Sequence, residues 1–292
     1  MKKLFSLLFL VTLVWSCHSS KENKEEEQVS ESFDQERDAF FTSMLTFTET
    51  AAKLQATAAE FNATFMNDPT LFNKYTSDAK AAANLGIYLA DLNYSLAYKQ
   101  SAHAKELFTA AQELSKSIDI EQSVLFFLSV RYEDTISQND SVQAVLNKQF
   151  KKSATDLKGT DREKLVGIAM AAYQIENLHL ALEIIEAYPK DMLPDDARTQ
   201  ILIPVFRMVL GQQKNVERIH SFLNTISDPM DPDKNSNHAY YLTALEEMIN
   251  VYKKLDVNEK IANNDGLELM KDAVVQELRA KVNAIRTRIV AP

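Results

Sequence analysis

The chain contains few of the residues that crosslink compact proteins or form their turns. Its 292 residues include one cysteine, five glycines, seven prolines and one tryptophan. A single cysteine excludes an intramolecular disulfide and a cysteine-based zinc site. So few glycines and prolines leave little material for strand hairpins or for loops that bind phosphate. The composition therefore favours a helical protein over a β-rich one.

Basic residues are also fewer than acidic ones. There are 32 Lys and Arg residues against 41 Asp and Glu residues, which gives a net charge of −9. A protein of this charge is a poor partner for nucleic acid or for anionic lipid headgroups. We therefore expect no nucleic-acid partner. Beyond the N-terminus the sequence contains no apolar run long enough to cross a bilayer, so we expect no membrane-spanning helix there.

The N-terminus carries the one strong sequence motif. Two lysines precede an apolar stretch, residues 4–14, which is followed by Trp15, Ser16 and Cys17. A basic start and a short apolar run are typical of a secretory signal. The stretch "LVWSC" resembles the lipobox of bacterial lipoproteins, although Trp15 is bulkier than usual for its position. The resemblance implies cleavage before Cys17 and acylation of Cys17, and two or three acyl chains anchor a protein firmly in a membrane.

A polar segment follows the cysteine. Residues 18–32 are rich in Glu, Lys, Ser, Asn and Gln, with Val29 as the only apolar residue. Such a segment cannot bury enough apolar surface to fold, so it predicts an extended tether. Its acidic stretch resembles the export signals of surface lipoproteins in Bacteroidota, and a solvated spacer explains it as well. The expected organisation is a signal at 1–16, a lipidated cysteine and tether at 17–32, and a helical domain at 33–292.

Apolar residues beyond residue 32 recur at helical spacing nearly everywhere. The pattern predicts one long helix over 40–65 and another over 71–96, with Asp68 as N-cap and Pro69 at the first helical position. We expect these two helices to form an antiparallel hairpin. Shorter helices are predicted at 101–117, 121–137, 141–157, 161–176, 178–188, 195–210, 215–227, 237–255 and 266–288. Gly159, Gly211 and the pair Asp265-Gly266 mark expected helix ends or starts.

Helix pairs of this length indicate a helical repeat. Ala104, Phe108 and Ala111 have the spacing of the second helix of the tetratricopeptide repeat (TPR), and Ala169, Ala181 and Ile185 fit its small, small and bulky positions. The domain therefore resembles a degenerate TPR array. The expected fold class is all-α, with the long N-terminal hairpin followed by TPR-like helix pairs, arranged as an α-solenoid or as an irregular bundle.

The most suggestive polar residue is Asp91, which lies in the otherwise apolar stretch "GIYLADLNYSLAY". Tyr88 and Tyr94 lie three residues before and after it, on the same helical face. These three residues are possible ligand-facing groups. Alternatively, Asp91 is a structural acid bonded to a tyrosine hydroxyl or to His103. Gly86 in the same stretch would let a neighbouring helix approach closely.

Other candidate chemistry is weaker. In the loop "DPMDPDKNSNH", Asp231, Asp233 and Asn235 alternate like calcium ligands, but Ser236 replaces the turn glycine and Leu242 replaces the bidentate glutamate. A polar helix linker is the alternative. The remaining histidines have no zinc spacing, and the sequence contains no nucleophile or phosphate-loop motif. We therefore expect no metal, no cofactor and no enzymatic activity.

These features predict a lipid-anchored envelope protein, most consistent with the outer membrane, on its periplasmic face or at the cell surface. Its partners would be the membrane, through the N-terminal lipid, and another envelope protein that the helical domain binds or scaffolds. The alternative is a substrate-capture lipoprotein that serves an outer-membrane transporter. That role resembles the starch-utilisation binding proteins of Bacteroidota, which are longer and rich in tryptophan.

Overall fold

The structure, a computed structural model, describes residues 59–120, 161–188, 194–226, 237–255 and 272–292. Within these ranges the chain is helical and has no strand, which confirms the predicted all-α class. The elements, in chain order, are the 3-10 helices η1 (Ala63–Phe65) and η2 (Pro69–Lys74) and the α-helices α2 (Asp78–Ala97), α3 (Ser101–Ser117), α6 (Asp161–Ala187), α7 (Asp195–Gly211), α8 (Gln213–Thr225), α9 (Asn237–Lys254) and α12 (Ala273–Val290).

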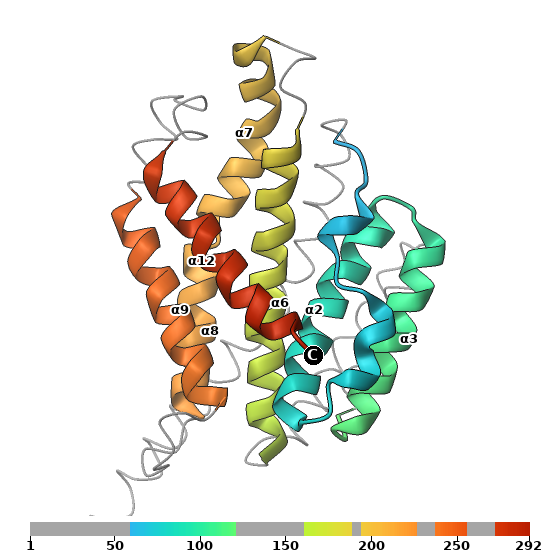
Figure 1. The fold of residues 1–292 in the computed structure, drawn as a ribbon. Coiled ribbons are helices and arrows are strands. Elements are labelled where there is room, and N and C mark those ends of the chain that lie inside the picture. The colour runs from blue at the N-terminus through green and yellow to red at the C-terminus, as the bar shows by residue number, and fades with distance from the viewer. Residues whose placement is uncertain (1–58, 121–160, 189–193, 227–236, 256–271) are drawn as a thin grey trace, which may run out of the picture.

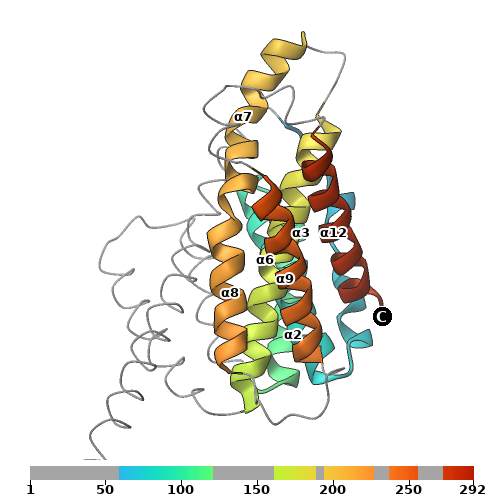
Figure 2. The same ribbon diagram turned by 90° about the vertical axis from the view of Figure 1, so that its left-hand side faces the viewer.

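The helix α6 lies at the centre of the bundle (Figures 1 and 2). It contacts α2 on one side and α7, α8, α9 and α12 on the others. Every residue from 167 to 182 is buried, as expected of a helix that is surrounded by other helices. The segment Arg162–Ala187 is long and apolar enough to cross a membrane, but 89% of its apolar 18-residue stretch is buried inside the fold. The core helix of a bundle has the same length and composition.

Helices α2 and α6 approach each other closely at Gly86. A Cβ atom at this position would lie 2.1 Å from the carbonyl oxygen of Ala169 and 2.8 Å from the backbone nitrogen of Tyr173. Glycine is therefore required here by the approach of the α6 backbone. The prediction that Gly86 admits a neighbouring helix is confirmed.

The predicted long hairpin differs from the structure where it can be compared. Residues 40–58 lie outside the described ranges, and residues 59–67 are not α-helical but hold the short η1. Asp68 does act as an N-cap and Pro69 follows it, but they begin the 3-10 helix η2. The α-helix starts only at Asp78, with the Ser77 side chain accepting a hydrogen bond from the Lys80 N–H. The prediction from helical spacing is wrong for residues 59–77, because the tertiary contacts described below hold this backbone in another conformation.

An antiparallel hairpin does exist, one helix later in the chain. It joins α2 to α3, whose bounds match the predicted 101–117. Lys99 closes α2 in the left-handed region with φ 57°, and the Gln100 N–H donates to the Ser95 carbonyl at 2.8 Å. This is the Schellman geometry that usually places glycine at the position of Lys99.

Several helix boundaries need correction. The predicted helices 161–176 and 178–188 are one continuous helix, α6, because no residue between them breaks the backbone ladder. Gly211 ends α7 as its last helical residue, without a left-handed conformation, and the chain passes through Gln212 (φ −77°, ψ −9°) into α8. The predicted helices at 121–137 and 141–157, Gly159 and Asp265-Gly266 lie outside the described ranges. The last helix begins at Ala273, capped by Asp272, and not at 266.

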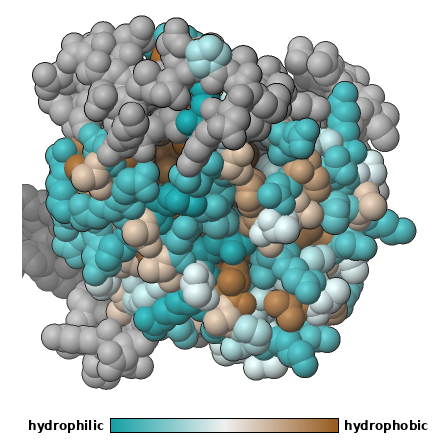
Figure 3. All heavy atoms as spheres, turned by 45° about the horizontal axis from the view of Figure 1, so that its top comes forward, coloured by the Kyte–Doolittle hydropathy of each residue, from teal (hydrophilic) through white to brown (hydrophobic). Residues whose placement is uncertain are grey.

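The residues with TPR-like spacing lie on α3 and α6. Ala104 and Ala111 are fully buried, as small residues at a helix–helix contact should be. Ala169, Ala181 and Ile185, however, all lie on the single long helix α6 rather than in a short helix pair. The surface drawn in Figure 3 is mainly hydrophilic outside the grey atoms, with apolar residues in small groups.

Candidate functional site

The polar interior of the bundle lies beneath residues 59–75, which we call the strap. The strap runs alongside α2 and α3 (Figure 1), and most of its length is not α-helical. Three side chains of α2 bind its backbone. The Asn62 N–H donates to the Tyr94 hydroxyl at 3.0 Å, the Asn67 N–H donates to Asp91 Oδ2 at 2.9 Å, and the Tyr88 hydroxyl donates to the Asp68 carbonyl at 2.9 Å.

The spacing of these residues explains the arrangement. Tyr88, Asp91 and Tyr94 recur every three residues on α2, so they form one stripe along the helix. The strap lies along that stripe, and its backbone takes the place of water as the hydrogen-bond partner of these three side chains. Buried backbone groups need such partners, and here side chains supply them in place of a helical ladder.

Asp91 belongs to a cluster of three ionisable residues, two of them fully buried and one partly buried, which we call the acid cluster: Asp91, Glu176 and Arg286. Asp91 and Glu176 are both 0% exposed. Arg286 on α12 binds Glu176 on α6 through two parallel hydrogen bonds, from Nε to Oε2 at 2.7 Å and from Nη2 to Oε1 at 2.9 Å. The Asp91 and Glu176 carboxyls are also close enough to interact electrostatically.

The charges in this cluster do not balance if both acids are ionised. Burial raises the pKa of Asp91 well above its usual value, and the negative charge of Glu176 raises it further. The guanidinium of Arg286 and the Asn67 N–H oppose that rise. Among the described residues, no N–H or O–H group donates to Asp91 Oδ1. The arrangement therefore favours a neutral Asp91 beside the Glu176–Arg286 ion pair.

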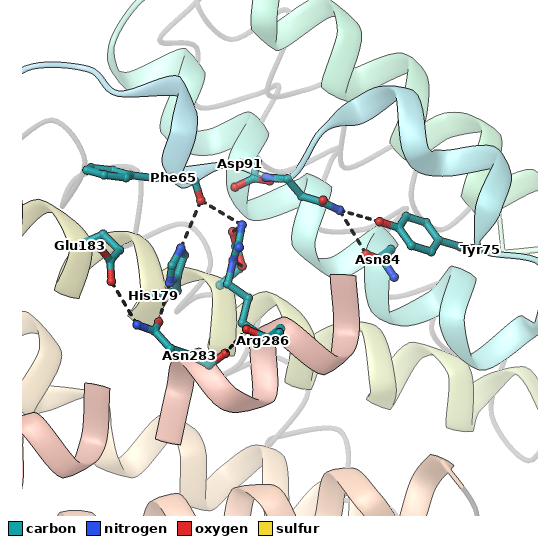
Figure 4. Close-up of polar contacts among 11 residues, drawn as sticks. Phe65, Tyr75, Asn84, Asp91, His179, Glu183, Asn283 and Arg286 are labelled. Atoms are coloured by element: carbon teal, nitrogen blue, oxygen red, sulfur yellow. Dashed lines mark hydrogen bonds and ion pairs between the residues drawn. The ribbon is translucent and has the colours of Figure 1, made fainter. Parts of the chain in front are cut away.

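A chain of polar contacts continues from the acid cluster to His179 (Figure 4). The carbonyl oxygen of Phe65, in the strap, accepts a hydrogen bond from Arg286 Nη2 at 2.9 Å and lies 3.2 Å from His179 Nε2. On the other side of the ring, Nδ1 lies 2.8 Å from Asn283 Oδ1. The Asn283 amide in turn donates to Glu183 at 3.2 Å. One carbonyl of the strap is thus held from both α6 and α12.

A second set of contacts fixes the C-terminal end of α12. The Tyr75 hydroxyl donates to the Val290 carbonyl at 3.0 Å, and Asn84 Nδ2 donates to the Ile289 carbonyl at 3.0 Å. Lys80 Nζ also binds the carbonyl oxygens of this last turn. These are the carbonyls that a helix end leaves without a partner. The Asn67 side chain joins the two sets by donating to Tyr75 and to Asn84.

The predicted ligand-facing residues lie together but face the protein itself. Tyr88, Asp91 and Tyr94 are each 0% exposed, and their polar groups contact the strap. The alternative, that Asp91 is a structural acid, gains support, although its donor is the Asn67 N–H rather than a tyrosine hydroxyl or His103. His103 instead packs its ring against Phe61, with centroids 5.5 Å apart.

The other sequence predictions of site residues fall elsewhere. Cys17 and the loop with Asp231, Asp233 and Asn235 lie outside the described residues, so both remain predictions. In the described part of the chain, no three His, Cys, Asp or Glu side chains are grouped as metal ligands.

Sequence reasoning missed Glu176, His179 and Arg286. Glu176 and His179 interrupt the apolar stretch of α6 as Asp91 interrupts that of α2, so the same signal could have found them. Arg286 lies on a helix with several other charged residues, and nothing in the sequence distinguishes it from them.

Comparison of this chain with models of protein families, with curated proteins and with solved structures gives no match. The class is therefore defined by the geometry alone. The described residues form an all-α protein in which ionisable groups of the interior bind a strap without α-helix to three helices.

Proposed function

We propose that the chain is a lipid-anchored protein of the bacterial cell envelope, whose helical domain binds or scaffolds another envelope protein. The observation that carries the proposal is the order of features at the N-terminus. A basic start, an apolar run, the sole cysteine at position 17 and an acidic polar segment follow one another within 32 residues. A lone cysteine at this point has a direct use as the site of acylation.

The described structure supports a binding role through the way its polar residues are used. The buried acids, the partly buried Arg286 and the buried His179 each contact backbone or side chains of the bundle, as described above. These groups therefore act in holding the fold. Because the exposed face in Figure 3 is mainly hydrophilic, the interface we envisage is of the polar, non-obligate type.

The anchor is tested by metabolic labelling of the full chain with an alkyne fatty acid in a bacterial host. The matched control is Cys17→Ala, which removes the only thiol. We expect label and membrane association in the native chain, and neither in Cys17→Ala. Equal labelling of the two chains would refute the anchor.

The partner is tested by crosslinking in intact cells, extraction of the native lipidated chain in detergent, and mass spectrometry. A single stoichiometric envelope protein is the expected result. The control is a variant of the same chain in which Lys253→Gln and Lys254→Gln remove two exposed positive charges at the end of α9. If the native chain crosslinks to no protein, or to many with no preference, the scaffold role is refuted while the anchor result stands.

A further inference from the structure

His179 lies between two hydrogen-bond acceptors. Its Nε2 is 3.2 Å from the carbonyl oxygen of Phe65, and its Nδ1 is 2.8 Å from Asn283 Oδ1. A neutral imidazole has one N–H group and one lone pair, so it can satisfy only one of these two contacts. The doubly protonated ring donates to both. The side chain is 8% exposed, so water does not readily take the place of either partner.

The orientation of the Asn283 amide determines whether it accepts from His179 or donates to it. A neighbouring acid fixes this orientation. Asn283 Nδ2 donates to Glu183 Oε1 at 3.2 Å, which directs Oδ1 toward the histidine. A reversed amide would place its oxygen against the Glu183 carboxylate. Arg279 donates to both Glu183 oxygens, at 3.0 and 3.2 Å, which fixes this acceptor in position. Asn283 is therefore an acceptor toward His179.

The charges around the ring come from three helices. Glu176 and Glu183 lie on the same helix as His179, one turn before and one turn after it. Arg279 and Arg286 approach from α12, and Asp91 approaches from α2 through the acid cluster. Each arginine is paired with one of the two glutamates, and the strap contributes a carbonyl oxygen. A positive ring between two carbonyl oxygens is thus compatible with its surroundings.

We propose that His179 makes attachment of the strap depend on pH. The protonated ring donates both to Phe65 in the strap and to Asn283 on α12, so it adds a second donor beside Arg286 on the same carbonyl. When the ring loses a proton, one of these bonds is lost. The remaining proton stays on Nδ1, in the shorter contact to Asn283, so the Phe65 carbonyl loses its histidine donor. The strap then loosens over Asp91 and Tyr94, which it covers. Residues 59–75 also connect the N-terminal region to the bundle, so the device lies where that region joins the folded domain. The inference does not depend on the proposed function.

Native-state hydrogen exchange of the full chain provides the test. The amide protons of Asn62 and Asn67 report on the strap, because they donate to Tyr94 and Asp91. Interior amides of α3, such as those of Leu107 and Ala110, serve as internal references. Protection is compared at about pH 5.5 and about pH 8, on either side of imidazole titration, after correction for intrinsic exchange. We expect strap protection to fall about tenfold at the higher pH, the effect of one hydrogen bond to a charged group, with little change in α3.

Three variants identify the responsible group. His179→Gln keeps a polar side chain that does not titrate, and it should remove the pH dependence. His220→Gln changes a histidine on α8 and should leave the dependence intact. Asp91→Asn keeps the acid cluster neutral and should also leave it intact. The proposal is overturned if wild-type protection does not change with pH, if His179→Gln behaves as wild type does, or if Asp91→Asn abolishes the effect.

A measurement on the wild-type chain covers the case in which His179→Gln does not fold. Ring-nitrogen NMR shows directly whether one or both nitrogens of His179 carry a proton. Loss of a ring proton must coincide in pH with the loss of strap protection. Titration of the ring without a change in strap protection would refute the coupling.

Discussion

The Gly86→Ala substitution is the most direct test of the packing between α2 and α6. In an exposed helix, exchanging glycine for alanine stabilises by about 1 kcal/mol, because alanine loses less backbone entropy on folding. At Gly86 the added Cβ would lie 2.1 Å from the Ala169 carbonyl oxygen and 3.0 Å from its carbonyl carbon. Those are backbone atoms of the central helix, so no side-chain rotation can relieve the overlap.

The expected size follows from two opposing effects. To restore an ordinary contact, α2 and α6 would have to separate by about 1 Å, which loosens a closely packed interface. Overpacking of this kind costs about 1–3 kcal/mol, and the rigid backbone places this case at about 3 kcal/mol. After the gain of about 1 kcal/mol in helix propensity, we expect a net loss of about 2 kcal/mol in the free energy of unfolding.

Two other glycines provide matched controls. A Cβ at Gly211 would meet nothing within 4 Å, so Gly211→Ala should stabilise by about 0.5–1 kcal/mol. At Gly167 the nearest atom is the end of the Leu223 side chain at 2.6 Å, which can move, so Gly167→Ala should give an intermediate value. Urea denaturation followed by far-UV circular dichroism measures all three at an unchanged m value. If Gly86→Ala is as stable as Gly211→Ala, the close approach of α2 and α6 is refuted.

Three further predictions concern the polar interior and the α2–α3 turn. Arg286→Met should destabilise by about 3–5 kcal/mol in denaturation experiments, because it leaves buried carboxyls without their counter-charge, and adding Glu176→Gln should recover part of this loss; equal stability of the single and double variants would contradict it. Because burial raises the pKa of Asp91, the folded chain holds a proton that the unfolded chain releases. The stabilisation is complete below the pKa of an unfolded aspartate, about 3.9, and is lost as pH rises through the folded value. Asp91→Asn should therefore become more stable relative to wild type as pH rises, and a constant difference across pH would count against a neutral Asp91. Lys99→Gly should stabilise by up to about 1 kcal/mol, because it relieves a left-handed lysine, and thermal unfolding that shows a loss would refute that reasoning.

The predictable part of the fold is the part that depends on local spacing. The bounds of α3 follow from apolar periodicity and match the structure, and α9 begins at the predicted residue and ends within one residue of the prediction. Gly86 was recognisable because a glycine inside an apolar helix usually has a packing reason. Asp91 was recognisable because an acid in an apolar stretch must find a partner.

The strap could not be predicted for a physical reason. Its apolar residues, including Phe61, Phe65 and Leu71, have helical spacing, and a helix was the better local solution. What holds the strap in another conformation is a set of bonds from residues far away in sequence, such as Arg286 to the Phe65 carbonyl, 221 positions away. Periodicity reports which residues are apolar, but it carries no information about which backbone groups a distant side chain will reach.

The acid cluster and the strap are best understood together. A buried pair of acids with one arginine is a poor way to gain stability, because removing charge from water costs about as much as the pairing returns. A cluster of this kind can instead specify how the strap lies on the bundle. The Asp91 carboxyl accepts a hydrogen bond from the strap, Arg286 donates one to the strap, and Glu176 orients Arg286. An apolar core of the same volume would pack α2, α6 and α12 equally well, but it would offer no partners for the backbone of residues 62–68. The strap would then be free to extend the helical pattern that its sequence favours. On this reasoning, the polar cluster selects the strap, with its two short 3-10 helices, over an α-helix through residues 59–75.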